Sequence, residues 1–128
     1  MDDKKKILIV EDNTETQLII KVSIRDLYDS TVVSNGQEAL DSFKDNNYSL
    51  VLLDINLGGE MDGRDVLERI RGELNQPNLP VIIITAYDLP DREKSFLMSL
   101  TCDYLEKPIS KDILLSSINK CLRRVTNR

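Results

Sequence analysis

The chain has 128 residues, of which 41% are hydrophobic and 30% are charged, and this size and composition fit a single globular domain with its own core. Its 22 acidic and 17 basic side chains give a net charge of −5, which argues against direct nucleic-acid binding, because such binding needs a clustered positive surface. The sequence contains no histidine. This absence excludes Ser-His and Cys-His catalytic pairs, haem ligation by imidazole and a phosphohistidine on this chain.

The two cysteines, Cys102 and Cys121, lie far apart in the sequence and form no CxxC motif, which fits neither a zinc site nor a disulfide framework. We therefore predict that both are reduced thiols. No apolar run approaches the roughly 18 residues of a membrane span. The amino-terminal Met-Asp-Asp-Lys-Lys-Lys also lacks the apolar stretch of a signal peptide. These features predict a cytoplasmic protein that does not contact a membrane.

Short apolar runs rich in β-branched residues occur at 7–10, 31–34, 50–53 and 81–84, and a weaker one at Tyr104 and Leu105. Continuous apolar runs of this length are typical of strands that are covered on both faces. A segment with helical spacing of apolar residues follows each run. The residues that mark these five helices are Leu18, Val22, Arg25 and Leu27; Ala39, Leu40 and Phe43; Val66, Leu67 and Ile70; Phe96, Leu97 and Leu100; and Ile113, Leu114, Ile118 and Leu122.

The strict alternation of strand and helix predicts an α/β fold, with a five-stranded parallel sheet between two layers of helices in a three-layer, doubly wound arrangement. Asn13 or Thr14 can cap the first helix, and Asn35-Gly36 marks the start of the second. No linker, repeat or low-complexity segment interrupts the pattern, so we predict that residues 1–128 form one domain. The chain ends directly after the fifth helix, and we expect output by protein contact unless a larger protein contains this chain.

Polar side chains directly follow four of the predicted strands. Glu11 and Asp12 follow the first strand, Asp54 the third, Thr85 the fourth and Lys107 the fifth. Ligands of open parallel sheets bind at the carboxyl ends of the strands, so these side chains are expected to share one site. Three clustered carboxylates repel one another unless a cation neutralises them, and an oxygen-only ligand set favours Mg²⁺. Thr85 and Lys107 are suited to bind phosphoryl oxygens, which makes an aspartyl phosphate the predicted chemistry.

Five segments of the chain, residues 7–13, 50–57, 61–63, 80–86 and 104–108, together resemble the receiver domain of two-component response regulators. The resemblance covers essentially the whole chain. It implies a flavodoxin-like fold with strand order 2-1-3-4-5 and a phosphoryl group accepted by Asp54 from a histidine kinase or a histidine phosphotransfer protein. It further implies that Glu11, Asp12, Asp54 and the main-chain carbonyl of Asn56 hold Mg²⁺, and that Thr85 and Lys107 bind the phosphoryl oxygens.

The same resemblance implies a switch that consists of Thr85 and Tyr104, and a target protein that binds the face formed by the fourth helix, fifth strand and fifth helix. Proteins of this kind catalyse only their own phosphorylation and dephosphorylation and are not enzymes in the usual sense. They exist as monomers or as phosphorylation-dependent dimers, and the sequence does not choose between these states. Tyr87, two residues after Thr85, is a further candidate, as a shield of the phosphoryl group against water.

Three features depart from the usual pattern of the family. The loop after Asp54 contains Gly58-Gly59 and is one residue longer, so we expect it to be looser beside the metal. Leu100-Thr101 replaces the usual Gly-Ala before the fifth strand, which removes the glycine that commonly ends the fourth helix. Leu89-Pro90-Asp91 predicts that this helix begins late.

Three alternatives remain. A phosphatase of the haloacid dehalogenase type also forms an aspartyl phosphate, but it needs a second aspartate two residues after the nucleophile, where Asn56 stands. A flavin carrier or nucleotide-binding protein is disfavoured because the chain has no glycine-rich phosphate-binding motif. A scaffold that acts without phosphorylation is disfavoured because every group of the acidic site is present.

Overall fold

The computed structural model describes residues 4–86 and 88–126. Five parallel strands in the order β2-β1-β3-β4-β5 form a single sheet, as predicted. The strands are β1 (Lys6–Val10), β2 (Asp29–Val33), β3 (Leu50–Asp54), β4 (Val81–Thr85) and β5 (Asp103–Glu106). The helices that alternate with them are α1 (Thr14–Ile24), α2 (Gly36–Ser42), α3 (Gly63–Arg71), α4 (Asp91–Ser99) and α5 (Lys111–Thr126). In the described part of the chain, no helix has the length and apolar character to cross a bilayer.

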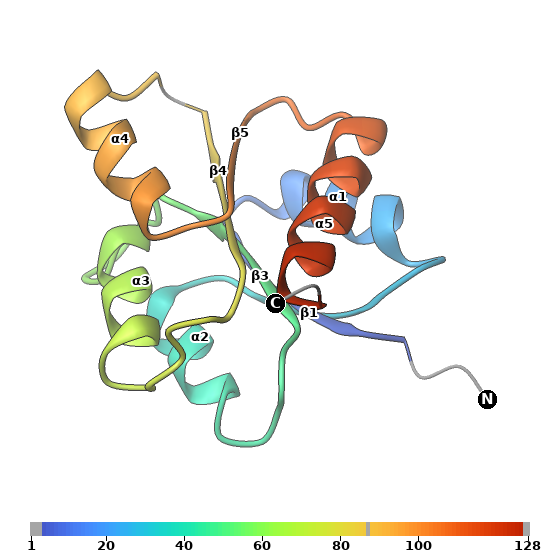
Figure 1. Cartoon of the computed structure of the whole chain (residues 1–128), viewed down its shortest axis with the longest axis horizontal. Helices are drawn as coiled ribbons and strands as arrows, with labels where there is room; N and C mark the ends of the chain where they lie inside the picture. The colour runs from blue at the N-terminus through green and yellow to red at the C-terminus, as the bar shows by residue number, and fades with distance from the viewer. Residues whose placement is uncertain (1–3, 87, 127–128) are drawn as a thin grey trace.

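The sheet lies between two helical layers, with α1 and α5 on one face and α2, α3 and α4 on the other (Figure 1). Alternate residues of the strands supply two hydrophobic clusters. Leu8, Val51 and Ile83 pack toward the layer of α2, α3 and α4, whereas Ile9 and Leu52 pack toward α1 and α5. All residues of β3 and β4 are buried. The continuous apolar runs of these strands are thus explained by burial on both faces.

Polar caps set the start of three helices near the carboxyl edge of the sheet. The Asn13 side chain accepts a hydrogen bond from the Thr16 amide, and Asn35 caps α2 in the same way. Asp62 and Asp65 form a capping box at the start of α3, which the sequence analysis did not predict. The helix α4 begins at Asp91, directly after Pro90, in agreement with the predicted late start. Its last turn ends at Leu100 in an ordinary right-handed conformation, without a glycine cap.

The prediction of which side chains of the first helix face the core is wrong. Leu18 is 63% exposed and Leu27 is 56% exposed, whereas Ile20 and Ile24 are fully buried. Residues 18, 19, 20, 22 and 24 are all apolar, so the sequence offers more than one helical stripe, and the packing against the sheet selects the pair with i, i+4 spacing. Phe96 and Ile113, which also marked predicted helices, are likewise more than half exposed.

The prediction of two reduced cysteines is also wrong, because Cys102 and Cys121 form a disulfide. Cys102 lies just before β5, and Cys121 lies on the buried side of α5. The packing of this helix against the sheet brings the two Cα atoms to 5.9 Å, which is within the range that a disulfide spans. This proximity depends on tertiary packing and is not visible in the spacing of the cysteines.

Candidate functional site

The residues predicted to form the site lie together at the carboxyl edge of the sheet. Asp54 is the last residue of β3 and pairs with Ile84, while Thr85 ends β4 and pairs with Glu106. Because the strands are parallel and nearly in register, the residues that follow them reach the same edge. Carboxylate oxygens of Glu11, Asp12 and Asp54 lie within 4.8 Å of one another.

Lys107 places its ammonium group between two of these carboxylates. The Nζ atom lies 2.7 Å from Oε1 of Glu11 and 3.2 Å from Oδ2 of Asp54. The Glu11 side chain is 1% exposed and that of Asp54 is 4% exposed, so both charges are largely removed from water. A positive charge in this position offsets the repulsion between the two carboxylates.

Backbone amides hold the second oxygen of each buried carboxylate. The Asn13 amide donates to Oε2 of Glu11 and the Asn56 amide donates to Oδ1 of Asp54, each at 2.9 Å. The exposed carboxylate of Asp12 accepts a hydrogen bond of 3.1 Å from the Gly58 amide. The loop with two glycines, predicted to be looser, is therefore anchored to the site through Asp12. Gly59 has a positive φ of 95°, a conformation that glycine adopts without strain.

Burial and charge shift the protonation of this cluster. Desolvation raises the pKa of Glu11 to about 6, in the same direction as the nearby charge of Asp54 and against the hydrogen bonds from Lys107 and Asn13. Desolvation by itself would lower the pKa of Lys107, but the hydrogen bond and charge of Glu11 and the charge of Asp54 outweigh it and raise the pKa. Lys107 therefore stays protonated at neutral pH, whereas the pKa of Glu11 lies close to neutral pH.

Two residues position the site in ways that the sequence analysis missed. The side-chain amide of Asn56 donates a hydrogen bond of 3.1 Å to the Thr85 hydroxyl, whereas only the main-chain carbonyl of Asn56 had been given a role. A Cβ atom on Gly63 would lie 2.4 Å from the carbonyl oxygen of Asp54, so only glycine allows α3 to begin this close to β3. A glycine at the first position of a helix is a signal that could have suggested such a close approach.

The three carboxylates fit a magnesium ion. They offer only oxygen ligands, which Mg²⁺ prefers, and one of them is exposed so that the ion can keep part of its water shell. The buried Oε1 of Glu11 contacts the Lys107 ammonium at 2.7 Å. A carboxylate has four lone-pair sites, so this contact leaves the group able to bind a cation as well.

Tyr104 lies on β5, away from the carboxylates. Its ring is half-buried and packs against the cluster on the α2, α3 and α4 side, and the ammonium group of Lys94 lies 4.8 Å from the ring centroid. The Tyr104 side chain thus links β5 to α4. Tyr87, the other aromatic candidate, lies outside the described residues.

Comparison with known proteins gives a consistent picture. A family model for the response regulator receiver domain matches residues 7–119. The chain is 37% identical over 124 residues to the uncharacterized transcriptional regulatory protein YkoG of Bacillus subtilis strain 168. This alignment covers 95% of this chain and 53% of that protein. It is 34% identical over 119 residues to the sensor protein GacS of Pseudomonas syringae pv. syringae, and this alignment covers 90% of this chain and 13% of that protein. The chain therefore spans about half or less of the length of these relatives.

Among solved structures, the receiver domain of the sensor histidine kinase PA1611 from Pseudomonas aeruginosa PAO1 superposes with a TM-score of 0.82 at 30% identity. The match covers 94% of this chain and 98% of that domain, which has a magnesium ion coordinated in its active-site cleft.

Proposed function

The chain belongs to the response regulator receiver domain family, a phosphoacceptor module of two-component signalling, and on this premise we propose that Asp54 is the residue that accepts the phosphoryl group. The observation that carries this proposal is the position of Asp54 between a cation and two further carboxylates. Its Oδ2 contacts the Lys107 ammonium, and its neighbours Glu11 and Asp12 complete a set of oxygen ligands. Family membership and geometry thus both support Asp54 as the proposed acceptor.

In the proposed reaction, a carboxylate oxygen of Asp54 attacks the phosphorus atom of a phosphohistidine on a partner protein. The phosphorus–nitrogen bond breaks, an acyl phosphate forms, and the released imidazole takes up a proton. Transfer of this kind depends mainly on positioning and charge neutralisation, which the site supplies without a general base. The Lys107 ammonium and the Thr85 hydroxyl bind oxygens of the transferred group. Hydrolysis of the acyl phosphate by water returns the carboxylate, so the domain catalyses both its own phosphorylation and its own dephosphorylation.

We assign Mg²⁺ to Glu11, Asp12, Asp54 and the main-chain carbonyl of Asn56. The close grouping of the three carboxylates and the all-oxygen ligand set support this assignment. When bound, the ion supplies positive charge that offsets the negative charge of the phosphoryl oxygens. Asp12 has a second task, because its hydrogen bond with Gly58 fixes the loop that follows β3 beside the ion.

For the output we propose that Thr85 moves toward the phosphoryl group and that the Tyr104 ring responds. A new acceptor at Asp54 attracts the proton of the Thr85 hydroxyl, whose oxygen accepts a hydrogen bond from Asn56. Thr85 belongs to β4, in which Ile83 pairs with Tyr104 of β5. A small movement at the site is thereby converted into a change of the face formed by α4, β5 and α5. A target protein reads this face, in the monomer or in a phosphorylation-dependent dimer.

The remaining assignments follow from the same premise. We propose that residues 1–128 form one receiver domain, supported by a single sheet that includes all five described strands. The phosphoryl donor is a histidine kinase or a histidine phosphotransfer protein. The domain is expected to act in the cytoplasm, where such donors are charged from ATP, and to have no direct contact with nucleic acid or membrane.

Incubation with Mg²⁺ and acetyl phosphate or phosphoramidate tests the proposal, with intact-mass spectrometry as the readout. We expect one added phosphate in the native chain and none in Asp54→Asn or in the presence of a metal chelator. Asp26→Asn, which changes an exposed carboxylate away from the site, is the control and is expected to behave like the native protein. Phosphorylation of Asp54→Asn to the native extent would overturn the assignment of the acceptor.

The phosphatase alternative is not favoured. Asn56 occupies the position of the required second aspartate, and its amide is already bonded to Thr85. Steady hydrolysis of a small phosphoester well beyond one equivalent per chain would be the contrary result.

A further inference from the structure

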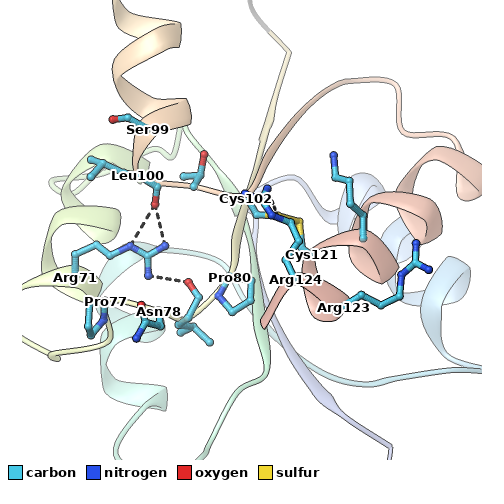
Figure 2. A pocket seen from close by; sticks show the side chains of 13 residues that line it. Arg71, Pro77, Asn78, Pro80, Ser99, Leu100, Cys102, Cys121, Arg123 and Arg124 are labelled. Carbon is cyan, nitrogen blue, oxygen red and sulfur yellow. Dashed lines mark hydrogen bonds between the residues drawn. A yellow bond between two sulfur atoms is a disulfide. The ribbon is translucent and has the colours of Figure 1, made fainter. Parts of the chain in front are cut away.

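A basic pocket lies at the opposite edge of the sheet from the phosphorylation site. Its volume is about 800 Å³, and its wall includes the Cys102–Cys121 disulfide (Figure 2). The amide of Cys102 donates to the carbonyl of Val81, the first residue of β4, which places the pocket at the amino ends of the strands. Four cationic side chains line it: Arg71, Lys120, Arg123 and Arg124. We refer to this cavity as the basic pocket.

The cations of the basic pocket are not equivalent. The Arg71 guanidinium donates hydrogen bonds to the carbonyl group of Leu100 (Figure 2) and to that of Leu79, and so has a structural role. The Lys120 ammonium is paired with Asp103 at 2.9 Å. Arg123 and Arg124 project from the exposed side of α5, and Nη1 of Arg124 lies 3.7 Å from Sγ of Cys102.

No acidic residue is found among the described residues that line the basic pocket, although the chain carries a net charge of −5. The charge of the protein is thus unevenly distributed, and the pocket is a locally positive surface. Anionic small molecules are expected to be concentrated there relative to cationic ones.

The two cysteines of the disulfide differ in burial, although both line the basic pocket. Cys121 is fully buried in the cluster between the sheet, α1 and α5. Cys102 is only partly buried and has the Arg124 guanidinium beside its sulfur. Neighbouring cations favour a thiolate over a thiol, and the thiolate is the form that attacks disulfides. When the bond is reduced, Cys102 is therefore the accessible nucleophile and Cys121 is the protected one.

We propose that Cys102 and Cys121 form a reversible modification site for anionic low-molecular-weight disulfides, with Cys102 as the entry thiol and Cys121 as the resolving thiol. In the first step, the Cys102 thiolate attacks one sulfur of the small disulfide, forms a mixed disulfide and expels a small thiolate, which takes up a proton. In the second step, the Cys121 thiol attacks Sγ of Cys102, loses its proton and expels the second small thiolate, which is protonated. The protein pair is oxidised by two electrons and the small disulfide is reduced to two thiols.

Contacts other than the disulfide also join α5 to β5. Next to the disulfide, the Asp103 carboxylate binds the hydroxyl of Ser117 and the ammonium of Lys120, both from α5. These contacts hold α5 against the start of β5 without the disulfide. Oxidation therefore adds a covalent bond to an existing contact, and it changes how firmly α5 is attached to the edge strand rather than whether it is attached.

The order of the two thiols can be tested with matched single variants. Cys121→Ala and Cys102→Ala are reduced, freed of reductant and exposed to oxidised glutathione, and intact mass follows the adduct over time. We expect Cys121→Ala to form a mixed disulfide at least about tenfold faster than Cys102→Ala, because the sulfur remaining in the latter is buried. Equal rates, or a faster reaction of Cys102→Ala, would overturn the proposal.

A second measurement uses the native sequence, in case a variant folds poorly. The reduced native protein is pulsed with an alkylating reagent, and peptide mapping compares the two cysteines. Labelling of Cys102 before Cys121 supports the proposal, and the reverse order contradicts it. Circular dichroism of the reduced and oxidised forms is expected to show the same secondary structure, because the Asp103 contacts persist.

The role of the basic pocket is tested by the charge of the reagent. Oxidised glutathione is anionic and cystamine is cationic, and Cys121→Ala is expected to react faster with the former, relative to their rates with a small unstructured thiol peptide. Adding Arg124→Gln should slow the glutathione reaction by about two- to fivefold, the range for an exposed charge interaction, and leave the cystamine reaction unslowed. Adding Arg92→Gln, an exposed arginine that does not line the pocket, is the control and should change neither rate. No preference for the anionic reagent would overturn the assignment of the ligand class.

Discussion

The side-chain amide of Asn56 donates a hydrogen bond to the Thr85 hydroxyl, with Nδ2 and Oγ1 3.1 Å apart. This contact joins the loop after β3 to Thr85, the last residue of β4. Asn56 donates to the hydroxyl oxygen, whereas the proposed phosphoryl group would accept the hydroxyl proton. Asn56 therefore positions this hydroxyl for the phosphoryl group.

Asn56→Ala is expected to weaken binding of the phosphoryl mimic, because the Thr85 hydroxyl loses the amide that positions it. The loss of one neutral hydrogen bond, about 1 kcal/mol, corresponds to roughly fivefold weaker binding of beryllofluoride, a mimic of the acyl phosphate, in the presence of Mg²⁺. Isothermal titration calorimetry provides the affinities. Unchanged or tighter binding by Asn56→Ala would mean that the amide does not position the hydroxyl for the phosphoryl group.

Lys107→Met is expected to destabilise the metal-free protein, because it leaves Glu11 and Asp54 as two buried carboxylates without a counter-ion. The free energy of unfolding should fall by about 3 kcal/mol in chelator at pH 7. Saturating Mg²⁺ should restore more stability to the variant than it adds to the native chain, since the ion replaces the lost charge. Urea denaturation followed by circular dichroism measures both effects. Lys44→Met removes an exposed lysine as a control, and equal unfolding midpoints for both variants in chelator would contradict the prediction.

Binding of Mg²⁺ is expected to weaken below neutral pH, because protons compete for Glu11. With the pKa of Glu11 raised to about 6 by burial, the carboxylate is mostly ionised at pH 7 and mostly protonated at pH 5. The apparent affinity should fall by about tenfold over this interval. Calorimetric titrations at several pH values test it, with Glu11→Gln as the control that binds weakly and loses this part of the pH dependence.

In the metal-free protein, the contribution of Glu11 to the free energy of unfolding should increase as the pH falls. The pKa of Glu11 is higher in the folded protein than its ordinary value of 4.5, so folding favours the protonated form. The stabilisation that this provides is fully present below pH 4.5 and is lost as the pH rises through about 6. Comparison of native and Glu11→Gln unfolding free energies in chelator isolates this contribution. A native-minus-variant difference that grows with pH would contradict the sign.

Gly63→Ala is expected to disturb the site through the backbone. The added methyl group would lie 2.4 Å from the carbonyl oxygen of Asp54, and a backbone atom cannot move aside as a flexible side chain does. A loss of about 2 to 3 kcal/mol in unfolding free energy is expected, together with impaired phosphorylation. Gly58→Ala is the matched control, because its new Cβ would be 3.4 Å from a side-chain oxygen of Asp12, an ordinary contact. Equal stability of the two variants would rule out the proposed packing constraint.

The sheet and the grouping of the site residues could be predicted because they follow from local patterns. A continuous apolar run such as 81–84 indicates a strand buried on both faces, and parallel strands bring the residues after them to one edge. Glu11, Asp54 and Lys107 are each adjacent to such a run, so their proximity required no knowledge of side-chain packing.

Features that depend on how a helix rotates against the sheet could not be predicted. Leu18 and Ile20 are both apolar, and only packing shows that the first is exposed and the second buried. The pairing of Cys102 with Cys121 depends on the same kind of information about α5. The bond from Asn56 to Thr85 was missed because it joins a loop residue to the last residue of β4, and their distance is set by the twist and register of β3 and β4.

The ion pair between Glu11 and Lys107 also bears on when the domain can first act. Glu11 follows the first strand to be synthesised and Lys107 follows the last, and β3 and β4 lie between those strands in the sheet. A chain still emerging from the ribosome without β5 holds the carboxylates but lacks their counter-charge. On the proposed function, competence to accept a phosphoryl group is therefore expected only after β5 and Lys107 have been synthesised, and any opening of the β5 edge is expected to withdraw it.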